Sequence, residues 1–226
     1  MLLEMPLFWA GATIAAFLFG QKLYLATGKL PLIPPIFTAI LLLISGLRLT
    51  GTSYDRYMEG GQYLHILLGP IVVMLAVPLY TQLRAMGQIW LRILLAVTLG
   101  SATTVLTAWT LVVWWLDDPM VATAMWTKSI TTPVAVSVTS QLGGDPALVA
   151  ASVIITGIFG VMLIVPLLRL MRMDSPECKG LTLGVCAHAI GTSRAMELGA
   201  SESAYAALGM TLTALLHAVA LPLILS

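Results

Sequence analysis

The sequence predicts an all-α protein that crosses a membrane several times, and three observations support this fold class. First, 59% of the 226 residues are hydrophobic and only 9% are charged. Second, the mean hydropathy is +0.97, well above the range of soluble proteins. Third, the apolar residues fall into long stretches, and spans of about 20 residues divide the chain into about seven or eight transmembrane segments. We expect them to form one transmembrane domain over residues 1–226.

The same composition excludes several classes of function. The formal net charge of +1 leaves no basic arm or patch that could hold nucleic acid. We assign Cys178 and Cys186 to neither a disulfide nor a metal, because a small apolar side chain suits the hydrophobic segment around them. The sequence contains no zinc-ligand spacing, nucleophile elbow, phosphate loop or dinucleotide fingerprint. We therefore expect no metal, no cofactor and no enzymatic activity.

The first half of the chain predicts three spans. Residues 5–25 are apolar and no Lys or Arg precedes them, so we expect a retained span rather than a signal peptide. The second span, residues 31–49, opens with prolines, which the first helical turn tolerates. We expect residues 50–62 to form a loop or an interfacial turn, closed by Gly60-Gly61. A third span over residues 63–83 contains prolines, so we expect kinks in it.

The second half contains two segments with polar residues in their middle. A fourth span ends at Trp114-Trp115, which are typical of a membrane interface. In the next segment, 120–142, Pro133 removes a donor and disfavours helical geometry at Thr132, which predicts a broken helix or a re-entrant hairpin. A clean span, a segment over 180–198 that holds a second break after His188, and a last span over 204–225 follow.

The chain also resembles itself at an interval of three segments. Gly60-Gly61 and Gly143-Gly144 each precede a span that ends in Val-Pro-Leu. An odd offset would give two copies of opposite orientation, as in many transporters. The pattern suggests an inverted repeat with halves 30–116 and 119–199, flanked by the first and last spans.

The positive-inside rule and the repeat make different predictions for the fifth segment. With an outside amino terminus, the basic residues of the first loops face the cytoplasm. If the fifth segment is re-entrant, Arg169, Arg172 and Lys179 face the cytoplasm too, whereas a crossing segment places them outside. The charges favour re-entry and the repeat favours crossing.

Three charged residues fall within apolar segments. A charged side chain at mid-bilayer costs at least about 2.5–3.5 kcal/mol, so it should face a cavity or a partner. Arg194 and Glu197 are spaced i and i+3, which suits either an ion pair or a ligand role for Arg194. Lys128 could reach an interface near Trp126 or bind a ligand.

The two breaks predict an anion site. A break leaves unpaired N–H groups at the start of a half-helix, and the helix dipole adds to their attraction for an anion. We expect His65 at an interface and His217 as a packed, satisfied histidine, and assign neither to the site. The candidate substrate-binding residues are Lys128, Thr131, Thr132, His188, Thr192, Ser193 and Arg194.

Four ordered motifs resemble one known family. They are GGQYLHILLGP at residues 60–70, AVPLY at 76–80, KSITTPVA at 128–135 and HAIGTSRA at 188–195. Over nearly the whole chain the sequence is similar to the LrgB/CidB family. This resemblance implies a multi-pass protein of the bacterial inner membrane, linked to murein hydrolase export, autolysis and antiholin-like control. It also implies a small holin-like membrane partner of the LrgA/CidA type.

The plant relatives of that family act as plastidial glycolate/glycerate translocators, and some bacterial members are implicated in moving pyruvate. Combined with the anion site, the resemblance predicts a secondary carrier of small monocarboxylates such as glycolate, glycerate, lactate or pyruvate. Lys128 or Arg194 would balance the charge, and His188 or Glu197 could carry a proton. The alternative is an antiholin-like regulator of murein hydrolase export that acts with the holin-like partner. We also expect a homodimer in the lipid bilayer.

Overall fold

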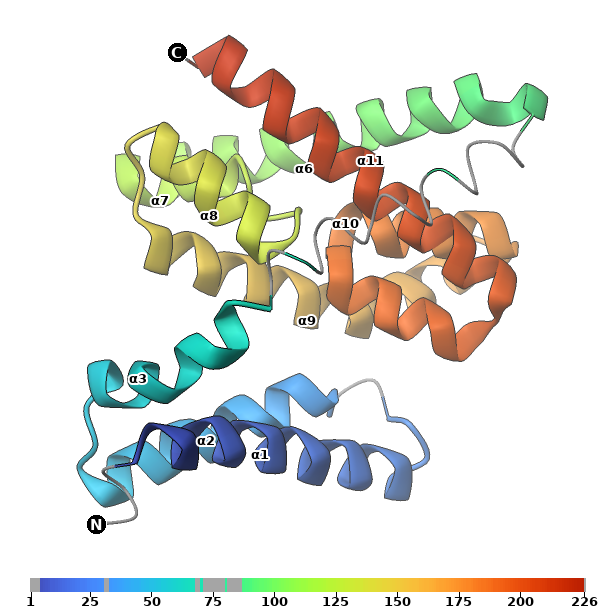
Figure 1. Cartoon of the computed structure of the whole chain (residues 1–226). Helices are drawn as coiled ribbons and strands as arrows, with labels where there is room; N and C mark the ends of the chain where they lie inside the picture. Colours follow the sequence, from blue (N-terminus) through green and yellow to red (C-terminus); the bar gives the residue numbers. More distant parts are fainter. Residues whose placement is uncertain (1–4, 31–32, 68–69, 71–79, 81–86, 226) are drawn as a thin grey trace. The chain divides into compact units, whose positions relative to one another are not determined.

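The computed structural model of the chain forms two compact units, Met1–Val72 and Val73–Ser226. It describes residues 5–30, 33–67, 70, 80 and 87–225 (Figure 1). These residues form nine α-helices and a short 3₁₀ turn, with no strand among them, which confirms the all-α prediction. The expectation of one transmembrane domain stays a prediction, and each unit is described by itself.

The first unit consists of α1 (Pro6–Ala26), α2 (Pro35–Thr50) and α3 (Tyr54–His65). Both α1 and α2 have proline in the first turn, where the missing N–H costs nothing. α1 packs against both other helices. A Cβ at Gly60 would meet the carbonyl oxygen of Pro6, so this glycine allows α3 to lie directly against the start of α1.

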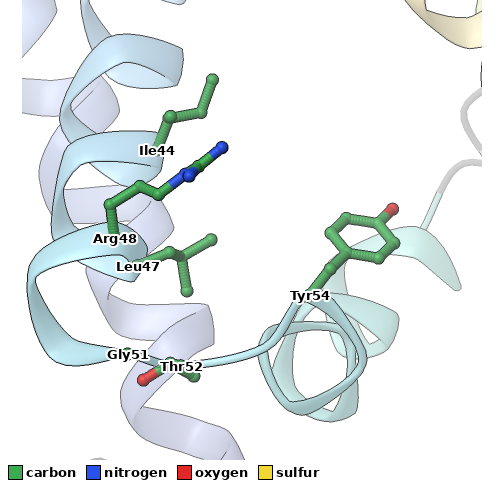
Figure 2. Close-up of a pocket in the computed structure, with 6 residues that line it drawn as sticks. All are labelled: Ile44, Leu47, Arg48, Gly51, Thr52 and Tyr54. Carbon is green, nitrogen blue, oxygen red and sulfur yellow. The ribbon is translucent and has the colours of Figure 1, made fainter.

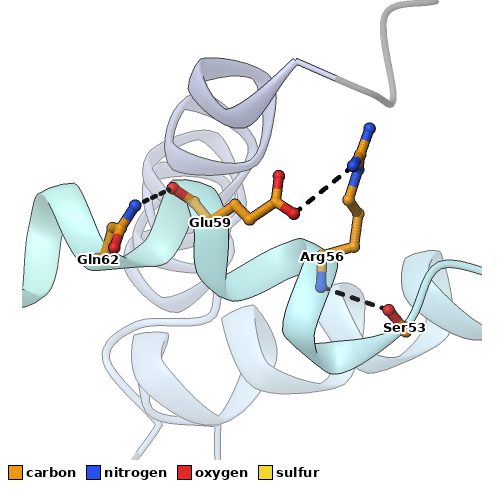
Figure 3. A network of polar contacts seen from close by, with 4 residues as sticks. All are labelled: Ser53, Arg56, Glu59 and Gln62. Carbon is orange, nitrogen blue, oxygen red and sulfur yellow. Dashed lines mark hydrogen bonds and ion pairs between the residues drawn. The ribbon is translucent and has the colours of Figure 1, made fainter.

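Helix α3 corrects the prediction of a loop or interfacial turn over residues 50–62. The Ser53 hydroxyl caps the helix by accepting a hydrogen bond of 3.3 Å from the Arg56 N–H. Along the exposed face Arg56 pairs with Glu59 at 3.5 Å, and the Gln62 side chain donates to the Glu59 carbonyl oxygen (Figure 3). The prediction gave weight to the two glycines and missed the capping serine.

The third predicted span, residues 63–83, lies mostly outside the described residues. Of this range the structure describes 63–67, 70 and 80. The predicted kinks therefore stay predictions, and residues 76–79 of the AVPLY motif lie outside the described residues.

Three helices of the second unit are long and apolar enough to cross a membrane. They are α6 (Trp90–Trp115), α9 (Pro146–Leu170) and α11 (Ala200–Leu225), and no other described helix meets both criteria. The turn η2 (Gly87–Ile89) precedes α6. α6 and α11 run in the same direction, because Val97 packs with Leu208 and, further along both helices, Ser101 bonds to His217.

The fifth segment is a helical hairpin made of α7 (Pro119–Met125) and α8 (Thr132–Gln141), which is compatible with re-entry. The hydroxyls of Thr127 and Thr139 share a hydrogen bond of 2.7 Å. A Cβ at Gly144 would lie 2.9 Å from Cγ2 of Thr123, so the chain returns to the end of the unit from which α7 started. This result supports the interpretation that the charges favoured.

Helix α10 (Pro176–Leu198) is a second helical hairpin, broken at His188 with φ 42° and ψ −131°. A Cβ at Gly191 would meet the Leu183 carbonyl oxygen, whereas residues eight apart on a straight helix are separated by about 12 Å. The first arm runs parallel to α11, since Gly180 touches Glu202 and Gly184 touches Ala206. The second arm must therefore return.

The two hairpins enter the second unit from opposite ends. As the first arm of α10 rises from Leu183 to His188, its neighbours on α9 descend from Leu168 to Val153, so α9 is antiparallel to α10's first arm and to α11. The order is hairpin, span, hairpin, span. Both predicted breaks are confirmed, but the predicted repeat with halves 30–116 and 119–199 and the count of seven or eight segments are not.

Candidate functional site

The tips of the two hairpins meet on the amino-terminal half of α9. Ile130, at the tip of the α7–α8 hairpin, is fully buried and belongs to one apolar cluster with Val149 and Val153. His188, at the tip of the α10 hairpin, donates from Nε2 to the Val153 carbonyl oxygen at 3.0 Å. The hairpin arms are about 10–18 Å long, near half the apolar thickness of a bilayer. In a bilayer, arms of this length would place the tips near its middle, where buried polar groups need partners.

The first tip carries Lys128, Ser129 and Thr131. Ser129 is fully buried, and its Oγ accepts a hydrogen bond of 3.3 Å from the half-buried Lys128 ammonium. In the described part of the chain, no carboxylate pairs with Lys128. Thr131 is only 6% exposed and precedes the first turn of α8, yet its Oγ1 makes no hydrogen bond to any described group. The tip thus presents a cation and a free hydroxyl beside the start of a helix.

The second tip places His188 where a non-glycine residue is strained, with a positive φ. The imidazole is 2% exposed and fits because Gly157 on α9 has no side chain. The half-helix that follows begins with N–H groups that lack an intrahelical acceptor. Its hydroxyls bond within the helix: Thr192 donates to the His188 carbonyl oxygen at 2.9 Å and Ser193 to that of Ala189 at 3.1 Å.

Helix α11 also packs on the first tip, since its Ala214 belongs to the same buried apolar cluster as Ile130 and Val153. Thr104 of α6 contacts the Cys186 sulfur at 3.9 Å. Ser101 of α6 shares a hydrogen bond of 2.6 Å with Nε2 of His217 on α11. The two tips, α6 and α11 thus surround one buried polar cluster, which we call the central site.

His217 and Ser101 were not predicted as site residues. The sequence suggested that His217 is packed and satisfied, and it is buried, but its Nδ1 has no hydrogen-bond partner among the described groups. A sequence signal existed, since Ser101 lies in a run of small and hydroxylated residues on an otherwise apolar span.

The other predicted site residues lie further from the tips. Arg194 and Glu197 form an ion pair of 2.5 Å on the returning arm of α10, as their spacing allowed. Thr132 begins α8 and is half-buried, and Ser193 is exposed. The structure therefore brings Lys128, Thr131 and His188 together, whereas Arg194 is paired with Glu197.

The charged groups at the carboxyl-terminal end of α9 lie in a different environment from those of the central site. In the turn before α10, the exposed Asp174 accepts a hydrogen bond of 2.8 Å from Lys179, with Arg169 at 4.0 Å. The hydrogen bond from Lys179 holds the pKa of the Asp174 carboxyl below its usual value. Such an exposed pair adds little stability.

Two surface hollows lie away from the central site. One, of about 370 Å³, belongs to the first unit, where Ile44, Leu47 and Arg48 of α2 face Tyr54 of α3 (Figure 2). The other, of about 330 Å³, lies at the junction of α6 and α7 beside Trp109, Asp117 and Asp118. None of the central-site residues lines either hollow.

Long apolar helices combined with two opposed hairpins, whose tips carry polar groups, are typical of a polytopic membrane protein. The family model described as LrgB-like matches residues 13–226, and the chain belongs to this family. It is 35% identical to the uncharacterized protein YxaC of Bacillus subtilis over 94% of this chain and 92% of that protein.

Two further relatives carry a functional name. The chain is 28% identical to proteins named antiholin-like protein LrgB from Bacillus mycoides and from Bacillus cereus, over 96% of this chain and 95% of each relative. No solved structure matches the chain at a significant level. These comparisons confirm the family resemblance of the four motifs.

Proposed function

We propose that the protein is a secondary carrier of small organic anions, which bind between the two hairpin tips. One observation carries this proposal: Lys128 is a half-buried cation at a hairpin tip, and no described carboxylate pairs with it. A cation held in an apolar interior needs a counter-charge or access to water. A bound anion would supply the counter-charge during transport.

The arrangement of the hairpins supports alternating access. Each tip is reached from a different end of the unit, so movement of one hairpin would open the site toward one side of the membrane. The half-helix that begins at Thr132 and the one that follows His188 both direct N–H groups toward their tips. This is the setting in which transporters bind anionic substrates.

We propose small monocarboxylates as the substrates, including glycolate, glycerate, lactate and pyruvate. Lys128 would pair with the carboxylate, and Thr131 would donate a hydrogen bond to it. His188 would position the second tip. Arg194 would be paired with Glu197 when no substrate is bound. The pair would either stabilise the returning arm of α10 throughout transport or release Arg194 as a second cation for the substrate. We also propose that transport is coupled to protons and that the protein is a homodimer in the bacterial inner membrane.

Charge distribution supports an orientation in that membrane. The end of the second unit where α6 and α10 begin carries Arg92, Arg169, Arg172 and Lys179 together with Asp174 and Glu177, and the opposite end carries Asp117, Asp118 and Asp145. The positive-inside rule would direct the basic end toward the cytoplasm. The α7–α8 hairpin would then enter from outside and the α10 hairpin from the cytoplasm.

The experiment is counterflow of labelled glycolate or pyruvate in proteoliposomes that contain the purified chain. The wild type and K22M, which changes an exposed lysine of the first unit, should both exchange label. K128M should lose exchange while it keeps the thermal stability of the wild type, because the methionine retains most of the side-chain volume. Exchange by K128M at the wild-type rate would rule out Lys128 as the substrate's counter-charge.

A second function, antiholin-like control of murein hydrolase export, is favoured by the names of the curated relatives. Those names support it more directly than they support a carrier. Under this hypothesis the tip residues only hold the helices together, and a small holin-like LrgA/CidA-type protein is the partner. Murein hydrolase activity released by cells that express K128M should then match that of the wild type, and no acid of a panel should be exchanged by the purified chain.

A further inference from the structure

His217 is a buried titratable residue that the proposed transport cycle does not use. It lies on α11, is only 4% exposed, and shares a hydrogen bond with Ser101 through Nε2. Its Nδ1 is also buried and makes no hydrogen bond to any described group. A buried polar atom that lacks a partner is unfavourable, so its persistence in a packed interior indicates a partner that is present only in one state.

The surroundings of His217 place it beside the first hairpin tip. Ala214, one turn earlier on the same face of α11, belongs to the apolar cluster that contains Ile130 of that tip. Thr131 lies next to Ile130, and its Oγ1 is a second buried polar atom without a partner among the described groups.

We infer that His217 is a ligand-contacting residue of the central site and that Ser101 is the positioning residue that orients its ring. This inference rests on the proposed carrier function and adds a specificity determinant to it. Lys128 pairs with the anionic group of the ligand. Nδ1 of His217 bonds to a second polar group on the adjacent carbon. The ligand therefore contains both groups.

The Ser101 hydroxyl suits this role because it can donate or accept. When Ser101 donates to Nε2, Nδ1 carries the proton and can donate to a carbonyl oxygen of the ligand. When Ser101 accepts from Nε2, Nδ1 can accept from a ligand hydroxyl. The ring can thus form a hydrogen bond with acids that carry an oxo or a hydroxyl group on the carbon next to the carboxylate. It can form no such bond with an acid that carries only hydrogens on that carbon.

Two amide substitutions separate a ligand role from a structural tie between α6 and α11. In H217Q the side-chain amide reaches the position of Nε2, so it retains the bond to Ser101 and loses the inner polar atom. In H217N the amide lies near the position of Nδ1, so it retains the inner atom and loses Ser101. The probes are labelled lactate and propionate, which have three carbons each and differ by one hydroxyl.

We expect wild-type proteoliposomes to prefer lactate over propionate by about tenfold, the discrimination of one buried hydrogen bond. H217Q should reduce the preference for lactate over propionate to near unity, and H217N should retain most of that preference. S101A should lower the preference less than H217Q, because the ring remains but is not fixed. The melting temperature of each variant, with and without 2-hydroxy acid, reports folding and binding apart from transport.

The outcomes distinguish this inference from the function on which it rests. A wild type that exchanges neither acid overturns the carrier function. A wild type that exchanges both without preference, or an H217Q variant that keeps the wild-type preference, overturns the role of His217 and leaves the carrier function standing. If H217N does not fold, the comparison of H217Q with S101A still decides between a ligand contact and a helix tie.

Discussion

Substitution of Gly157 by alanine should weaken the seat of the α10 hairpin on α9. A Cβ there would lie 2.6 Å from Cδ1 of Ile190 and 2.9 Å from Cε1 of His188. The isoleucine can rotate, but the imidazole is held by its bond to the Val153 carbonyl oxygen. Overpacking of this kind costs about 1–3 kcal/mol, against a gain of about 1 kcal/mol from alanine in a helix. Loss of the His188 bond adds about 1 kcal/mol.

We therefore expect G157A to lose about 1–3 kcal/mol, a fall of several degrees in melting temperature for a chain of this size. Amide exchange in residues 183–193 should accelerate, because the hairpin tip opens more often. The matched control is G46A on α2, where a Cβ has no neighbour within 4 Å, and it should be neutral or slightly stabilising. A G157A protein with wild-type melting and unchanged amide exchange would refute a fixed His188 ring.

Three further predictions follow from the polar contacts. T139V should cost about 1–3 kcal/mol, because it leaves the buried Thr127 hydroxyl unpaired, and the double variant T127V/T139V should recover much of that loss in thermal melts. E197Q should destabilise more than the pair R194Q/E197Q, because it leaves the half-buried Arg194 guanidinium without its carboxylate; equal melting temperatures would contradict a stabilising pair. Asp174 has a lowered pKa in the folded chain, so its contribution to stability is present above its unfolded pKa of about 4 and is lost as the pH falls. The stability difference between the wild type and D174N should accordingly vanish in acid, and a difference that persisted at the lowest pH would contradict this assignment.

Local chemistry in the sequence predicted the parts of the fold that depend on near neighbours. Pro133 broke the fifth segment where its missing N–H predicted a break, and the i, i+3 spacing of Arg194 and Glu197 produced the ion pair. The helix α3 was missed because a capping serine and two glycines gave opposite signals, and glycine is compatible with a helix that approaches another closely.

Long-range contacts account for what the sequence did not predict. The return of α10 depends on a positive φ at His188 and on Gly191 packing against Leu183, and neither follows from helix periodicity. The unpaired buried Nδ1 of His217 depends on how Ser101 holds the ring, and these two residues lie 116 positions apart in the chain. A histidine alone on an apolar span is typical of a satisfied core residue, so only the fold could show that one ring nitrogen lacks a partner.

The order of hairpins and spans also determines when each segment can insert and pack during synthesis of the chain. The helices α7 and α8 are each too short to cross a bilayer, so after α6 has been inserted they must wait in a shallow position with Lys128 near water. Val149 and Val153 of α9 cover one side of the tip, and Ala214 of α11 covers another. Because α11 follows both the hairpin and α9 in the chain, the first tip reaches its buried place only after α11 has been synthesised.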